Sequence, residues 1–298
     1  MADRSHLLTE LRLPESMNLD SMSIEEAVAL MNQQDSAAVA AVATQQPQIS
    51  EAIRLVVSAV RAGGRLIYVG AGTSGRLGVL DAAECPPTFR TDPNLVQGII
   101  AGGEAAMFRA QEGAEDSREG GAKTIDEKNI GPHDVVMGIA AGGTTPFVHG
   151  ALQQARARGA KTIFLSCVQR VENEPEVDVV IRPLTGPEVV TGSTRLKAGT
   201  ATKLVLNTIS TLAMVQLGKV YENLMVDLRA TNNKLQDRAE RIVATLTGEP
   251  RERGRELLME AQGHVKLAIV MHGRKVDVGG AQQILNEAGG DLRKALES

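Results

Sequence analysis

The sequence predicts an α/β protein with a doubly wound, mostly parallel sheet, N-terminal helices and a small all-α C-terminal domain. Between residues 65 and 217, short apolar runs alternate with helical patterns, as in parallel sheets covered on both faces. Glycine-rich loops follow two of these runs and lead into helices. After about residue 237 the alternation stops, and short helical pieces are separated by glycines.

Composition narrows the class of protein. The 298 residues are 43% hydrophobic and 23% charged, which suits a soluble globular protein of one or two domains. A net charge of −4 and 2% aromatic residues disfavour nucleic-acid and membrane partners. Cys85 and Cys167 form neither a disulfide framework nor a metal-binding pair. With no apolar signal or membrane-spanning segment in the sequence, we expect a cytoplasmic protein.

Residues 1–46 are predicted to form a helical N-terminal lead-in. Ser23 and Glu26 have the spacing of a capping box. Ile24 and Val28 continue with helical spacing. We therefore expect a helix that begins just after Ser23.

Residues 47–236 are predicted to form the main α/β domain. Its first helix begins at Pro47 and ends at Gly63–Gly64. We expect Pro86–Pro87 to stop a second helix. The expected strands are 65–69, 95–100, 134–140, 162–165 and 177–183. The expected helices after the first strand are 75–83, 104–115, 146–158 and 197–217.

The remaining residues, 237–298, are predicted to form the small helical C-terminal domain. Five helical segments are separated by glycines, and no strand alternates with them.

Loop 1, residues 69–78 (VGAGTSGRLG), connects a strand to a helix. Backbone N–H groups at such a helix start favour anions. Residues 70–75 match the G-x-G-x-x-G pattern of dinucleotide loops, but no acidic residue ends a second strand about 20 residues later. The hydroxyls of Thr73 and Ser74 instead suit a terminal phosphate monoester.

Two further loops share this character: loop 2, residues 139–146 (IAAGGTTP), and loop 3, residues 191–200 (TGSTRLKAGT). An ordinary turn explains any single loop about as well as a ligand site does. The three together favour a phosphosugar site, although Ser193 as a helix cap and solvated cations nearby remain an alternative. The candidate binding residues are Gly72, Thr73, Ser74, Gly75, Arg76, Gly143, Thr144, Thr145, Ser193, Thr194 and Lys197.

Longer motifs carry a family resemblance. GAGTSGRLG (70–78) and TGSTRLKAGT (191–200) resemble the sugar isomerase fold, whose members bind phosphosugars in hydroxyl-rich loops. LDAAECPPTF (80–89), IAGGEAAMFRAQEGAEDSREGG (100–121) and MVDLRATNNKL (225–235) resemble the N-acetylmuramic acid 6-phosphate etherases. The resemblance covers nearly the whole chain.

The resemblance implies a lyase of the hydro-lyase type that acts in amino-sugar catabolism and peptidoglycan recycling. Such an enzyme converts N-acetylmuramic acid 6-phosphate to N-acetylglucosamine 6-phosphate and D-lactate, by elimination across C2–C3 and then addition of water. It also implies a homodimer. No cofactor or metal is expected, and the histidines show no clustered ligand spacing. Gly142 and Thr144 stand where the family usually carries serine and arginine.

Two carboxylates are the candidate catalytic residues. Glu84 is expected at a helix end, where the helix dipole disfavours an anion, and this favours a functional role. Glu115 by itself reads as a solvated acidic residue. The resemblance implies that Glu84 protonates the departing lactate and that Glu115 is the base. We expect Cys85 to be a buried apolar residue.

Two other functions compete with the lyase. A regulatory protein of the same fold would sense a phosphosugar without turnover, but binding alone does not need an acid–base pair. Aldose–ketose isomerisation shares proton abstraction at C2 but leaves the family motifs unexplained.

Overall fold

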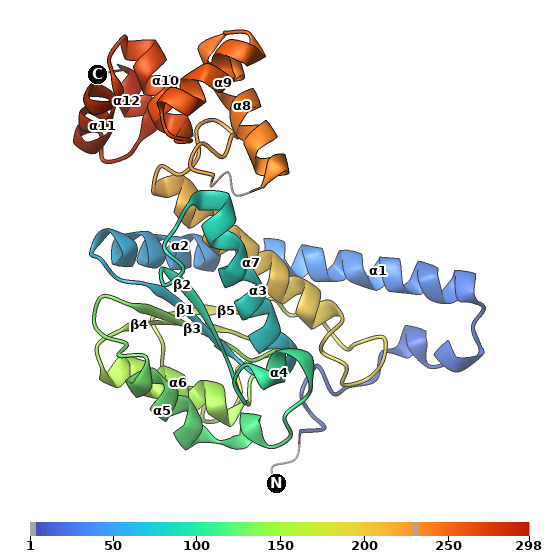
Figure 1. Cartoon of the computed structure of the whole chain (residues 1–298). Coiled ribbons are helices and arrows are strands. Elements are labelled where there is room, and N and C mark those ends of the chain that lie inside the picture. Colours follow the sequence, from blue (N-terminus) through green and yellow to red (C-terminus); the bar gives the residue numbers. More distant parts are fainter. Residues whose placement is uncertain (1–3, 229–231, 298) are drawn as a thin grey trace. The chain divides into compact units, whose positions relative to one another are not determined.

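The structure, a computed structural model, describes residues 4–228 and 232–297 (Figure 1). It divides into two compact units. Unit 1 comprises Met1–Ala83 and Asn94–Ser210, and unit 2 comprises Glu84–Pro93 and Thr211–Ser298. These units differ from the predicted three-part division, because the lead-in belongs to unit 1 and unit 2 begins before residue 237. The three-part domain division stays a prediction.

Unit 1 contains one five-stranded sheet in the order β2-β1-β3-β4-β5, and every pairing is parallel. The predicted parallel α/β fold is therefore confirmed. Gly70 pairs with both Ile100 and Ile139, so β2, β1 and β3 end in register at the carboxyl edge. The strands are β1 (Leu66–Gly70), β2 (Val96–Ile100), β3 (Val135–Ile139), β4 (Lys161–Leu165) and β5 (Val179–Ile181).

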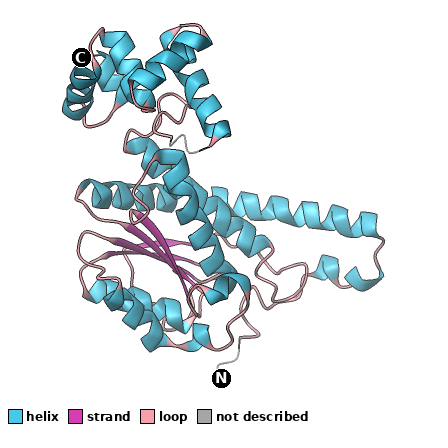
Figure 2. Ribbon diagram, viewed as in Figure 1, coloured by secondary structure: helices cyan, strands magenta, loops and turns pink. Residues whose placement is uncertain are grey.

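Helices cover both faces of the sheet (Figure 2). On one face, Ile67 and Val69 pack in a buried cluster with Ile125 and Phe147 from the helices α5 and α6. Tyr68 points to the other face, where its hydroxyl donates to Asp81 of α3 at 2.8 Å. The helices that lie wholly or partly in unit 1 are α1 (Ile24–Ala43), α2 (Gln46–Arg61), α3 (Gly72–Phe89), α4 (Ala105–Phe108), α5 (Arg118–Glu127), α6 (Pro146–Ala157) and α7 (Lys197–Gln216).

The N-terminal helices begin where their sequences predict. The Ser23 hydroxyl accepts from the N–H of Glu26 at 3.2 Å, and the Glu26 carboxylate accepts from the N–H of Ser23 at 2.9 Å. This reciprocal pair confirms the capping box at the start of α1. Pro47 lies in the first turn of α2, where a missing N–H costs nothing.

Two helix predictions are wrong. Pro86–Pro87 does not stop α3, which continues to Phe89. The N–H of Arg90 donates to the carbonyl of Pro86 at 2.9 Å, and the buried side chains of Cys85 and Phe89 anchor this last turn. Packing therefore outweighs the two hydrogen bonds that the prolines cannot make. Cys85 is buried, as predicted.

The predicted helix 104–115 is in fact two short pieces. These are α4 and the 3-10 turn Ala114–Asp116, separated by residues 109–113, of which Gly113 has a left-handed φ of 75°. The sequence prediction also missed α5. Its N-cap is Ser117, whose hydroxyl accepts from the N–H of Gly120 at 2.9 Å.

Unit 2 is helical apart from its connecting segments, as predicted for the C-terminal region. Its helices enclose one buried cluster that includes Leu258, Ile269 and Leu285. Among the described residues, no helix combines the length and the apolar character needed to cross a membrane. The helices that follow α7 are α8 (Asn233–Thr247), α9 (Arg251–Glu260), α10 (Val265–Arg274), α11 (Val278–Glu287) and α12 (Leu292–Glu297).

Close packing of α5 on α6 yields a first prediction. A Cβ atom at Gly121 would lie 1.9 Å from the carbonyl oxygen of Phe147, which is backbone and cannot rotate away. We expect Gly121→Ala to lower the free energy of unfolding by at least about 2 kcal/mol, because this overlap outweighs the better helix propensity of alanine. Gly131→Ala is the control, since no atom lies within 4 Å of its Cβ position. Urea unfolding measures both, and equal stability of the two variants would contradict this packing.

Candidate functional site

Loops 1 and 2 meet at the carboxyl edge of the sheet. Loop 1 follows β1 and loop 2 follows β3, and these strands are neighbours. From β1 the chain passes outward to β2 and then returns to β3 on the opposite side. In open parallel sheets, ligands bind at such a reversal of strand order.

Loop 3 lies against the other two loops. The N–H of Gly192 donates to the carbonyl of Thr9 at 3.1 Å, and a Cβ atom on Gly142 of loop 2 would lie 3.7 Å from the Thr9 hydroxyl. Thr9 is fully buried, so the N-terminal segment joins loops 2 and 3. A Cβ atom on Gly199 would lie 3.6 Å from the Thr73 methyl group. The structure therefore gathers the three predicted loops in one region.

The hydroxyl groups in these loops are available to a ligand. Within residues 4–228 and 232–297, none of six predicted hydroxyls has a hydrogen-bond partner in the protein. Thr145 is the N-cap of α6, yet its side chain makes no capping hydrogen bond. The six hydroxyls are those of Thr73, Ser74, Thr144, Thr145, Ser193 and Thr194.

His149 holds the shape of loop 2, a role that the sequence did not reveal. Gly143 is buried and left-handed at φ 74°, and its carbonyl oxygen lies 2.8 Å from Nε2 of His149. Burial lowers the pKa of His149, so the neutral ring donates to this oxygen. In the sequence, His149 lies within the apolar pattern of α6, and nothing in that pattern indicates a hydrogen bond to Gly143. Only the folded structure shows this contact.

The N–H groups at the start of α7 are already bound by a carboxylate of the protein, that of Glu188. The buried Glu188 carboxylate accepts from the N–H groups of Lys197 and Ala198 at 2.9 and 3.0 Å. The Lys197 side chain is also buried, and its ammonium donates to Gln34 of α1 at 2.7 Å. In this structure the Lys197 side chain ties α1 to α7.

A cavity of about 210 Å³ in unit 1 brings Gly72 and Arg76 of loop 1 together with Glu115. The Arg76 guanidinium donates to the carbonyls of Ala106 and Met107 at 2.7 and 3.0 Å. Arg76 was predicted to bind substrate. It also fixes α4, and with it the segment that leads to Glu115.

Glu84 and Glu115 are both exposed. Glu84 lies inside α3 and not at its end, so the predicted unfavourable placement at a helix terminus is wrong. Glu84 belongs to unit 2 and Glu115 to unit 1. Within the 225–235 motif, residues 229–231 lie outside the described residues.

Comparison with known proteins decides the family. The chain is 54% identical over all 298 residues to the N-acetylmuramic acid 6-phosphate etherase of Synechocystis sp., and the match covers 98% of that protein. It is 55% identical to the Nostoc punctiforme etherase, over all of this chain and 97% of the relative. The chain belongs to the N-acetylmuramic acid 6-phosphate etherase family. The family resemblance seen in the sequence motifs is confirmed.

Two family models also match this etherase-family chain. They describe the N-terminal SIS domain of glucokinase regulatory protein, at residues 48–156, and the C-terminal lid domain of the same protein, at residues 222–268. A phosphoheptose isomerase structure from Francisella tularensis matches with a TM-score of 0.51 and 17% identity, over 65% of this chain and 99% of that chain. At this identity the match supports the sugar isomerase fold alone.

The Arg76 contacts yield a second prediction. Arg76→Lys replaces the guanidinium fork with one ammonium group, which cannot reach both carbonyls with the same geometry. We expect backbone amides of residues 103–109 to exchange hydrogen at least about tenfold faster, because a charge-assisted hydrogen bond is lost. Hydrogen exchange with mass spectrometry measures this. Arg109→Lys is the control, since Arg109 is exposed, and unchanged exchange in Arg76→Lys would show that Arg76 does not hold α4.

Proposed function

We propose that this protein cleaves the D-lactyl ether of N-acetylmuramic acid 6-phosphate to give N-acetylglucosamine 6-phosphate and D-lactate. The observation that carries the proposal is 54% identity over the whole chain to an etherase. The reaction belongs to amino-sugar catabolism and cell-wall recycling, and we place it in the cytoplasm. No observation favours a regulatory role, because the relatives that match the full chain are etherases.

The three loops supply the phosphate site in this proposal. Helix starts at α3 and α6 direct backbone N–H groups toward an anion. The hydroxyls of Thr73, Ser74, Thr144, Thr145, Ser193 and Thr194 add uncharged donors around them. No atom of the described residues lies within 4 Å of the Cβ position of Gly72, so its backbone is open to the phosphate. Gly75 and Gly143 instead pack closely against Ile100 and Val168 and so shape loops 1 and 2. Lys197 is left out, because its ammonium is buried against Gln34.

The chemistry requires an acid and a base. An ether resists hydrolysis because its alkoxide leaves poorly, but the open-chain sugar has a C1 aldehyde that acidifies the proton on C2. A base removes this proton, the C3–O bond breaks, and an acid protonates the lactate oxygen. Water then adds its oxygen to C3 and a proton returns to C2. Each acid–base contribution is worth about 10²- to 10⁴-fold in rate.

We assign Glu115 as the base and Glu84 as the acid. Glu115 lines the same cavity as Gly72 and Arg76 of loop 1, which supports a place beside the bound sugar. Glu84 lies on α3, the helix that begins at loop 1. Both side chains are exposed and thus open to substrate. This assignment stands on the family motifs and the cavity together.

We also propose that the enzyme acts as a homodimer. The N-terminal segment and α1 carry exposed apolar side chains, and exposed apolar surface of this kind is typical of protein interfaces. These residues are Leu11, Met17, Ile24, Val28 and Val39, of which Ile24 is 79% exposed.

The third prediction tests the two carboxylates. We expect Glu84→Gln and Glu115→Gln each to reduce D-lactate release from N-acetylmuramic acid 6-phosphate by at least about 100-fold, because each removes a proton-transfer group. Glu119→Gln, an exposed carboxylate in the first turn of α5, is the matched control. In H₂¹⁸O, mass spectrometry is expected to find the label at sugar C3. Label in the lactate would contradict elimination, and full activity in both variants would contradict the assignment.

The fourth prediction concerns Gly142, where the family usually carries serine. Its Cβ position meets only the Thr9 hydroxyl at 3.7 Å, so a serine side chain fits. We expect Gly142→Ser to bind N-acetylglucosamine 6-phosphate about threefold more tightly or better, because it adds a hydroxyl donor. Gly143→Ser is the contrast, since Gly143 is left-handed at φ 74° and its Cβ would lie 3.0 Å from Val168. Titration calorimetry measures affinity, and weaker binding by Gly142→Ser would contradict the phosphate role of loop 2.

A further inference from the structure

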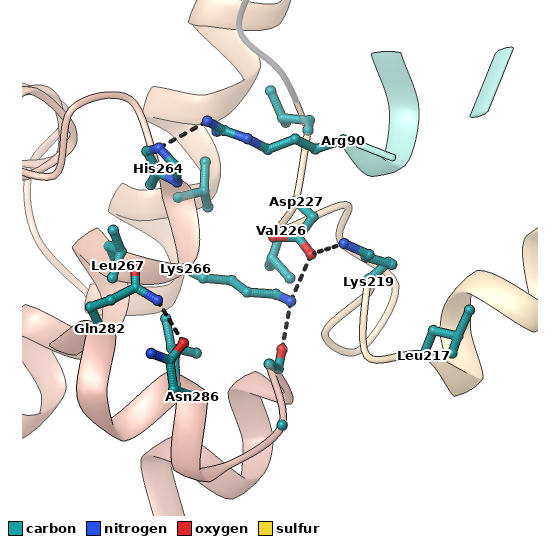
Figure 3. Close-up of a pocket in the computed structure, with 15 residues that line it drawn as sticks. Arg90, Leu217, Lys219, Val226, Asp227, His264, Lys266, Leu267, Gln282 and Asn286 are labelled. Atoms are coloured by element: carbon teal, nitrogen blue, oxygen red, sulfur yellow. Dashed lines mark hydrogen bonds and ion pairs between the residues drawn. The ribbon is translucent and has the colours of Figure 1, made fainter. Parts of the chain in front are cut away.

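Unit 2 contains a second cavity, of about 230 Å³, which we call the C-terminal pocket (Figure 3). Side chains line it from the end of α3, the connection between α7 and α8, and the helices α10 and α11. It shares no lining residue with the cavity that holds Arg76 and Glu115. The proposed lyase reaction does not account for the charged side chains that line this pocket.

Two lysines of the pocket share one carboxylate. Lys266 and Lys219 lie 2.7 and 3.2 Å from the same oxygen, Oδ2 of Asp227. Lys266 also donates to the carbonyl of Gly290 at 2.6 Å, and its side chain is only 9% exposed. Asp227 is the one carboxylate among the described residues that line the pocket, so the two ammonium groups exceed the lining carboxylates by one positive charge. Asp291, outside this lining, also attracts Lys266.

Arg90 adds a second excess charge. Its one side-chain hydrogen bond among the described residues joins Nη2 to Nε2 of His264 at 2.8 Å, and no described carboxylate lies within ion-pair distance of its guanidinium. Burial lowers the pKa of His264, and the nearby Arg90 lowers it further. The imidazole is therefore neutral near pH 7 and accepts from Arg90 without offsetting its charge.

The rest of the lining suits a small polar molecule. Gln282 and Asn286 of α11 present exposed amides at the pocket, and they hydrogen-bond to each other at 2.9 Å. Leu217 and Leu267 supply apolar surface. An ion network that only stabilised the fold would pair each partly buried cation, because an unpaired charge costs free energy.

We propose that the C-terminal pocket binds the dianionic phosphate group of a small metabolite, with Arg90, Lys219 and Lys266 as its charged ligands. A phosphate monoester carries close to two negative charges at neutral pH and balances the two excess positive charges. The guanidinium of Arg90 matches phosphate geometry, and the two ammonium groups act as point charges. The amides of Gln282 and Asn286 are the donors and acceptors for hydroxyls on the attached carbon skeleton.

Inorganic phosphate is the probe that tests this pocket in the full-length chain. We expect phosphate to slow hydrogen exchange in peptides that cover residues 262–268 and 285–291, measured by mass spectrometry. Equilibrium dialysis with radiolabelled phosphate gives the affinity. Arg90→Gln and Lys219→Gln are each expected to abolish this protection and to weaken the binding that accompanies it at least about tenfold, because each removes a charge-assisted contact. Lys294→Gln removes the same charge from an exposed position outside the pocket and serves as the control.

Several results would overturn the proposal. Protection confined to loops 1 and 2 would place the phosphate at the sheet edge alone. Unchanged protection at 262–268 in Arg90→Gln and Lys219→Gln, or an equal loss in Lys294→Gln, would show that these charges do not form a site. If Arg90→Gln fails to fold, as circular dichroism would show, Lys219→Gln alone decides, because its side chain is 28% exposed. Lactate release is not a readout, so failure here leaves the proposed reaction untouched.

Discussion

The parallel pairing of β1 with β3 is the constraint on which the rest of unit 1 depends. Because Gly70 and Ile139 are in register, the loops that follow them leave the sheet at one edge and side by side. Thr9 then joins loop 2 to loop 3 through its buried backbone and side chain. Segments more than a hundred residues apart in the chain thus form one polar surface.

At this edge of the sheet, the N-termini of α7 and α6 differ in whether the protein itself supplies a hydrogen-bond partner. At α7 a buried carboxylate from Glu188 accepts the first N–H groups, so this terminus is satisfied within the protein. At α6 the N-cap Thr145 makes no capping bond, and neighbouring hydroxyls have no partner among the described residues. Since helix termini need partners for their N–H groups, the difference separates a structural terminus from one open to an anion. Sequence alone does not separate them, because all three loops have similar composition.

The sequence predicted the sheet well because each strand is a short, continuous apolar run between turn residues. The sequence-based predictions were wrong where contacts between distant parts of the chain determine the local structure. Pro86–Pro87 reads as a helix stop, but the buried Cys85 and Phe89 keep the last turn of α3 in place. Lys197 reads as a cation beside a phosphate loop, yet Gln34, 163 positions earlier in the chain, accepts its ammonium. Local patterns contain no information about such distant partners, so the sequence did not reveal the contact between Lys197 and Gln34.

Arg76 shows how the same fold links binding to chemistry. An arginine that only bound substrate would leave its guanidinium free, but this one donates to two carbonyls of α4. The segment after α4 is irregular and includes the left-handed Gly113 just before the 3-10 turn that carries Glu115. A proton transfer depends on distances controlled to fractions of an ångström. The first turn of α3 therefore contributes in two ways. Its backbone N–H groups form part of the proposed anion site, and its Arg76 side chain holds the segment that leads to Glu115, the proposed base.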